Sequence, residues 1–267
     1  MYFLDSHAHL LDPAFEQDRA EVIRRMQETG VTRWVEIGCQ TDEWEPALNL
    51  CTQYPQHTVC ALGIHPEFAH TYTPHEQARL TELLKDPRVV AVGEIGLDYF
   101  YLAECPEDIQ LHTLHQMIAL ANSVQKPIVL HVRRQEEDYT PYLKTFEILK
   151  HEWTPLPRSH SGILHCFSAG YEQAAQALDY GLLLGINGCF TYKKNEYIRQ
   201  AVKKVGARHL VLETDCPYLS PQGKRGTRND PSNIPLIAQW VADYLDMPVE
   251  KLAEITTQNA LEVYGWK

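Results

Sequence analysis

Short segments rich in apolar and β-branched residues alternate along the chain with longer segments whose apolar residues recur at helical spacing. The short segments are typical of buried strands and span residues 2–5, 33–37, 58–62, 89–92, 128–130, 162–164, 182–186 and 210–212. The longer segments predict helices at about 15–29, 42–53, 75–85, 106–124, 138–150, 170–180, 195–205, 233–245 and 248–263. Strict alternation of strand and helix predicts an α/β fold with a parallel sheet. Eight strands close a (β/α)8 TIM barrel, so we expect that fold.

The length and composition fit one globular unit. A barrel of roughly 250 residues commonly forms a single domain, and we expect residues 1–267 to do so. The chain is 44% hydrophobic and 22% charged, which excludes disordered and fibrous classes. It has 35 acidic residues against 24 Lys and Arg, for a net charge of −11. That balance argues against a protein that coats duplex DNA, but an enzyme with a locally positive site stays open.

Three features indicate a cytoplasmic protein without a membrane segment. No apolar stretch approaches the roughly 18 residues that cross a bilayer. The first residues lack the features of a secretory signal peptide. The seven cysteines are scattered and form no CxxC pair, as expected for reduced thiols in the cytosol. We also expect the protein to act as a monomer.

Side chains that can bind metal ions follow six of the eight predicted strands. In chain order they are His7, His9, His65, Glu94, His131, His165 and Asp215. The carboxyl ends of barrel strands form the active-site face of this fold. The pattern therefore predicts one metal site at the carboxyl-terminal face of the barrel.

The residue types in this set indicate two divalent cations. His7 and His9 are two positions apart, so both imidazoles point to the same side of an extended chain. Glu94 follows a buried apolar run, where an unpaired carboxylate would be costly without a cation. Apart from His65, the set has four imidazoles and two carboxylates, which suffice for two ions. Ligands without thiolates suit zinc, manganese, iron or nickel and tolerate magnesium. His65 fits either a structural histidine or a substrate contact.

Seven sequence blocks give the chain a family resemblance. They are DSHAHL (5–10), GIHP (63–66), GEIGLDY (93–99), PIVLH (127–131), LHCFSAG (164–170), LETDCPYLSP (212–221) and RGTRNDP (225–231). With these blocks in this order, the chain resembles the TatD family of metal-dependent deoxyribonucleases, within the amidohydrolase-like barrels. The resemblance covers nearly the whole chain and implies the barrel fold.

The resemblance also implies which residues bind the two metals. It assigns His7 and His9 to the first metal and makes Glu94 the bridge between both. It assigns His131 and His165 to the second metal.

Further roles concern catalysis and substrate. The resemblance implies that Asp215 is a ligand beside the first metal and handles the proton of the attacking water, so that Asp215 and Glu94 are the catalytic residues. Candidates for contacts with substrate phosphates are His65, Arg133, Arg225 and Arg228. Candidates for stacking on unpaired bases, with ordinary packing as the alternative, are Phe68, Tyr99, Phe100, Tyr101 and Tyr192.

These residues and the resemblance lead to one main hypothesis. We expect a metal-dependent hydrolase that cleaves DNA phosphodiester bonds, as a 3′–5′ exonuclease on single-stranded DNA. It would use a water that bridges two Mg, Mn or Zn ions. A D-aminoacyl-tRNA deacylase, a lactonase or another ester or amide hydrolase would use the same site. A non-catalytic barrel is disfavoured because no ligand is missing, and a structural zinc protein because structural zinc prefers closed cysteine-rich sites.

Some positions near the blocks need their own interpretation. Cys166 and Cys216 adjoin proposed ligands, and we expect both to serve as buried packing. Arg134 adds a second arginine after His131, and the segment 153–161 is longer than the family pattern. These departures bear on substrate preference and leave the proposed metal ligands intact.

Overall fold

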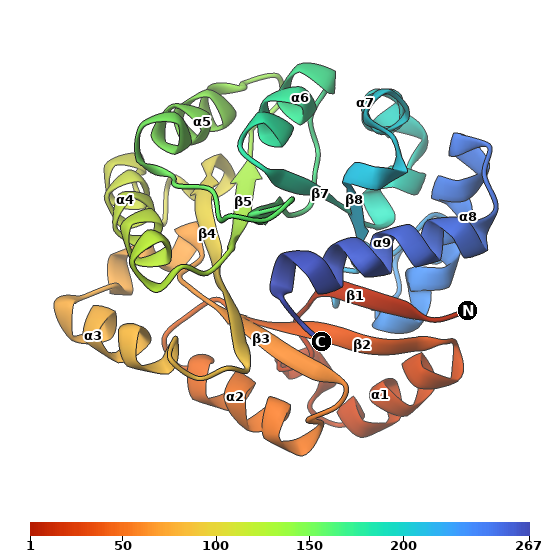
Figure 1. The fold of residues 1–267 in the computed structure, drawn as a ribbon, viewed down its shortest axis with the longest axis horizontal. Coiled ribbons are helices and arrows are strands. Elements are labelled where there is room, and N and C mark those ends of the chain that lie inside the picture. The colour runs from red at the N-terminus through yellow and green to blue at the C-terminus, as the bar shows by residue number, and fades with distance from the viewer.

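The computed structural model describes residues 1–267 and shows eight strands in one sheet, each parallel to its neighbours in the order β1 to β8 (Figure 1). The strands are β1 (Phe3–Ala8), β2 (Val31–Gly38), β3 (Thr58–Leu62), β4 (Val89–Asp98), β5 (Ile128–Arg133), β6 (Gly162–Leu164), β7 (Leu182–Ile186) and β8 (Leu210–Leu212). The helices are α1 (Arg19–Glu28), α2 (Trp44–Gln53), α3 (Pro74–Leu83), α4 (Glu107–Val124), α5 (Thr140–Glu152), α6 (Tyr171–Asp179), α7 (Glu196–Val205), α8 (Ile234–Leu245) and α9 (Val249–Tyr264). The (β/α)8 TIM barrel is confirmed.

The first and last strands meet at their carboxyl ends. The backbone N–H of Asp215 donates to the carbonyl of His7 at 3.0 Å, and the N–H of His9 donates to the carbonyl of Cys216, also at 3.0 Å. Closure of the barrel therefore places the segment after β1 directly against the segment after β8.

Helix α9 covers the amino-terminal mouth of the barrel, across which it runs in Figure 1. Its residues Ala260, Val263 and Tyr264 join the apolar cluster that fills the lumen, to which every strand contributes. Arg158, which precedes β6, donates to the carbonyl of Val263 at 3.1 Å. The long segment 153–161 therefore lies at the mouth opposite the proposed site. A second, larger core lies between the sheet and the outer helices.

The predicted elements are confirmed, with shifts at their ends. β4 continues six residues beyond the predicted end at 92, because its backbone stays paired with β5 up to Asp98. β1 and β5 also extend through the polar residues that follow their apolar runs. The first helix begins at Arg19 rather than near 15, because Pro13–Phe15 forms a separate 3-10 turn in which the Asp12 side chain accepts the N–H of Ala14.

None of the helices combines the length and the apolar character that a membrane span requires.

Candidate metal centre

The six proposed ligands converge at the carboxyl-terminal mouth, and local backbone features aim the one from β4. The β4–β5 register shifts between Gly93 and Ile95, so Glu94 is an extra residue in a bulge. Such bulges re-aim a side chain next to active sites. Two residues further, a Cβ on Gly96 would lie 1.8 Å from the carbonyl oxygen of His131, so only glycine allows this approach of β4 to β5.

Four donor atoms form the first group. The Nε2 atom of His7 lies 3.2 Å from both Oε2 of Glu94 and Nε2 of His9. Oδ1 of Asp215 lies 3.4 Å from Nε2 of His9 and 3.8 Å from that of His7. Two ligand atoms that each lie about 2.1 Å from one tetrahedral metal ion are about 3.4 Å from each other. The observed separations therefore fit a single divalent cation among these four atoms.

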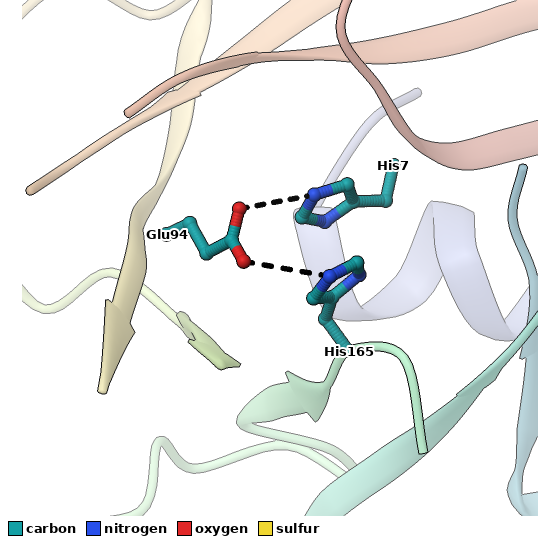
Figure 2. Close-up of side chains that lie close together, drawn as sticks. All are labelled: His7, Glu94 and His165. Carbon is teal, nitrogen blue, oxygen red and sulfur yellow. Dashed lines mark ion pairs between the residues drawn. The ribbon is translucent and has the colours of Figure 1, made fainter. Parts of the chain in front are cut away.

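The other oxygen of Glu94 faces a second group. Its Oε1 atom lies 2.6 Å from Nδ1 of His131 and 3.4 Å from Nε2 of His165. Figure 2 shows the Glu94 carboxylate with one oxygen toward His7 and the other toward His165. These two imidazole rings stack with their centroids 3.5 Å apart. One carboxylate thus divides its oxygens between two groups of side chains. In the second group the 3.4 Å separation from His165 matches two ligands of one ion, whereas the 2.6 Å separation from His131 is that of a hydrogen bond.

Two buried carboxylates behind the histidines are missing from the sequence-based set. Oδ2 of Asp98 lies 2.8 Å from Nε2 of His131, on the side of the ring away from Glu94. Oε1 of Glu213 lies 3.1 Å from Nδ1 of His165, again behind the ring. Such carboxylates fix the tautomer and orientation of a metal-binding histidine. Both follow apolar residues in the same blocks, so the burial argument used for Glu94 would have found them.

The buried carboxylates and histidines of the site shift one another's pKa values toward the charged forms. Burial would raise the pKa of Glu94, but His165, His7 and His131 outweigh it and hold that pKa well below its ordinary value. Burial would likewise lower the pKa of His131, but Glu94 and Asp98 raise it to about 10. The buried carboxylates therefore require positive charge beside them, which a proton on His131 or a bound cation supplies.

The proposed substrate contacts divide into two pairs. His65 lies beside a proposed ligand, with its Nε2 atom 4.0 Å from Oε1 of Glu94, and Arg133 lies beside the supporting carboxylate, with its Nη1 atom 3.9 Å from Oδ2 of Asp98. The other two arginines make no hydrogen bond or ion pair with a proposed ligand. Arg225 lies over the ring of Tyr192, and Arg228 forms an ion pair with Asp18.

The two cysteines beside proposed ligands differ in their surroundings. Cys216 is buried, as predicted for packing. Cys166 is only half-buried, and its sulfur, a nitrogen of His165 and an oxygen of Asp215 all lie within 4.8 Å of one another. Packing alone therefore does not describe Cys166.

Known proteins similar to this chain share its family. The family described as TatD-related DNase matches residues 4–265. The "uncharacterized metal-dependent hydrolase YabD" of Bacillus subtilis is 35% identical, over 97% of this chain and 98% of that protein. The "3'-5' ssDNA/RNA exonuclease TatD" of Erwinia amylovora is 31% identical, over 98% of this chain and 99% of that protein. The crystal structure of the TatD homologue YJJV from Escherichia coli K12 superposes with a TM-score of 0.88 at 27% identity, over 99% and 98% of the two chains.

Proposed function

This chain belongs to the family of TatD-related DNases, and from that premise we propose that it removes nucleotides from the 3′ ends of single-stranded DNA. It is a metal-dependent hydrolase that acts on ester bonds. The proposal narrows the ester to a DNA phosphodiester, with residues 1–267 acting as one domain and the protein as a monomer. The Erwinia amylovora relative, named as a 3′–5′ exonuclease, supports this choice.

The observation that carries the proposal is the division of the Glu94 carboxylate between two donor groups. We assign His7, His9, Glu94 and Asp215 to one divalent cation, and Glu94 to a second cation together with the remaining two histidines. Those two are His131 and His165. When bound, two Mg, Mn or Zn ions lower the pKa of an attacking water and stabilise charge on the phosphoryl and leaving oxygens.

Asp215 is assigned as the general base and acid. Its Oδ1 atom faces His7 and His9, which leaves Oδ2 for a proton. Its side chain is 14% exposed, so water reaches it. The free oxygen can accept a proton from the attacking water and return it to the leaving 3′ oxygen.

Cationic and polar side chains at the rim would hold the substrate. His65 lies beside Glu94 and Arg133 lies beside Asp98, and both would contact the oxygens of the cleaved phosphate. Arg225 and Arg228 would bind phosphates further along the strand. Arg228 must first release Asp18, so we expect its contribution to be smaller.

Degradation of a 5′-labelled single-stranded oligonucleotide tests the proposal. The reaction is run with Mg²⁺ or Mn²⁺, with EDTA, and with the Asp215→Asn variant. The expected result is a ladder that shortens from the 3′ end and is lost with EDTA and in the variant. A fully active Asp215→Asn enzyme would refute the assigned role of Asp215. An intact oligonucleotide with protein shown to hold two metals would refute the nuclease and make an aminoacyl-tRNA ester the next substrate to assay.

A further inference from the structure

We propose that Phe100, backed by Arg133, is a stacking platform for an unpaired nucleobase beside the metal centre. The proposal rests on the function proposed above and adds a binding subsite to it. The ligand class is the base of a flexible single strand, since a paired base in a duplex has both faces covered by its neighbours.

Phe100 is an exposed aromatic residue at the mouth of the barrel, with the ring of Tyr101 at its side, 5.3 Å between the two centroids. It is 56% exposed and lies two residues beyond the end of β4, at the mouth that holds the metal centre. The flanking tyrosines differ: Tyr99 is buried and donates its hydroxyl to Glu107, and Tyr101 is half-buried beside His65. An exposed aromatic ring at the rim of the site offers a face on which an unpaired base can stack.

One buried carboxylate fixes the position of Phe100 relative to the metal centre. Oδ2 of Asp98 lies 2.8 Å from His131, a proposed ligand. Oδ1 of the same carboxylate accepts the backbone N–H of Phe100 at 2.8 Å. The Asp98 carboxylate therefore connects the backbone of Phe100 to the ligand histidine.

Strand register places Arg133 behind the ring. In the β4–β5 pair, Gly96 lies opposite His131, and Asp98 lies opposite Arg133, two residues closer to the rim. The guanidinium carbon of Arg133 lies 4.2 Å from the centroid of the Phe100 ring. The arginine covers one face of a ring that is 56% exposed, so a base would stack on the exposed part, and the arginine charge would be available to the neighbouring phosphate. Because every base has a π face, such a platform tolerates any sequence.

A substrate-and-protein cycle tests the platform. KM is measured for a single-stranded oligonucleotide and for the same oligonucleotide with abasic sites at its two 3′-terminal positions. For the wild-type enzyme, loss of the bases raises KM about 5- to 150-fold, the range of one stacked base. Phe100→Ala raises KM for the intact oligonucleotide by a similar factor, so that the intact and the abasic oligonucleotide have the same KM. Phe100→Trp restores the difference, because indole also stacks.

A matched variant and a binding assay complete the design. Tyr2 is 57% exposed and precedes β1 at the opposite mouth, so Tyr2→Ala keeps the wild-type preference for the intact substrate. Binding of both oligonucleotides to Asp215→Asn, with and without Phe100→Ala, is followed by fluorescence anisotropy, a readout independent of turnover.

The outcomes separate this inference from the proposed function. If the wild-type enzyme cuts neither oligonucleotide, the proposed nuclease activity fails. If it cuts both with equal KM, or if Phe100→Ala preserves the difference between them, the nuclease stands and the platform is refuted.

Discussion

Replacing Asp98 by Asn tests whether the carboxylate behind His131 controls metal binding. In the wild-type protein, Oδ2 of Asp98 faces Nε2 of His131 at 2.8 Å and keeps a proton on that nitrogen. Nδ1 is then free to face Glu94 and a cation. An Asn amide group would donate to Nε2 instead and move the proton to Nδ1, the nitrogen needed for the metal. The oxygen of Asn can still accept the N–H of Phe100, so the local backbone is preserved.

The expected size of the effect follows from the character of this contact. Loss of a partner behind a metal-binding histidine typically costs about 10- to 100-fold in metal affinity or activity. Asp98 is fully buried and its hydrogen bond is charge-assisted, so we expect the upper part of that range. The effect should fall on the second cation, because His131 contacts only the Oε1 side of Glu94.

The assay is a titration of metal-free protein with Mn²⁺ at pH 8, followed by calorimetry and by activity. Asp98→Asn should weaken one of two binding steps and leave the other within about twofold. Glu107→Gln is the control, because Glu107 binds Tyr99 and Lys144 at the same mouth but contacts no imidazole. Two unchanged binding steps and wild-type activity in Asp98→Asn would refute the reasoning.

Three further predictions concern stability. Mn²⁺ at 100 times its Kd should stabilise the folded protein by about 2.7 kcal/mol. Removal of the cation with EDTA should therefore lower Tm in a thermal melt by roughly 5–10 °C. An equal Tm with Mn²⁺ and with EDTA would show that no cation binds the folded state preferentially. Gly96→Ala places a Cβ against the His131 carbonyl and should lower the free energy of unfolding, measured with urea, by about 1–3 kcal/mol. Elemental analysis should also show a reduced metal content. Wild-type values of both quantities would contradict the close approach of the two strands. Burial raises the pKa of Glu36 to about 7, so the folded state retains a proton that the unfolded state releases at lower pH. The free energy of unfolding of the metal-free protein should therefore fall by up to about 3 kcal/mol as pH rises from about 5 to about 7. Glu36→Gln should remove the part of this fall that the Glu36 proton causes. A pH profile of unfolding that is unchanged in the variant would exclude Glu36 as its source.

Much of the fold was predictable from the sequence because it depends on local patterns. Apolar runs such as 182–186 and 210–212 identify strands whose ends match the structure, and alternation with helical segments leaves few topologies. The ends of β1, β4 and β5 were predicted short, because polar residues ended the apolar pattern while backbone pairing continued. Pairing depends on the neighbouring strand, which local composition does not reveal.

In the candidate site, too, some features follow from the sequence and others only from the tertiary structure. The sequence by itself determined the residue types and their place after the strands, since a barrel brings all carboxyl ends to one mouth. It determined neither the division of the Glu94 oxygens between two groups nor the support of His131 by Asp98. It also left five aromatic residues equivalent, of which the structure leaves Phe100 the most exposed beside the centre. These features depend on angstrom-scale contacts between strands far apart in the chain, and only the closed, packed barrel sets those distances.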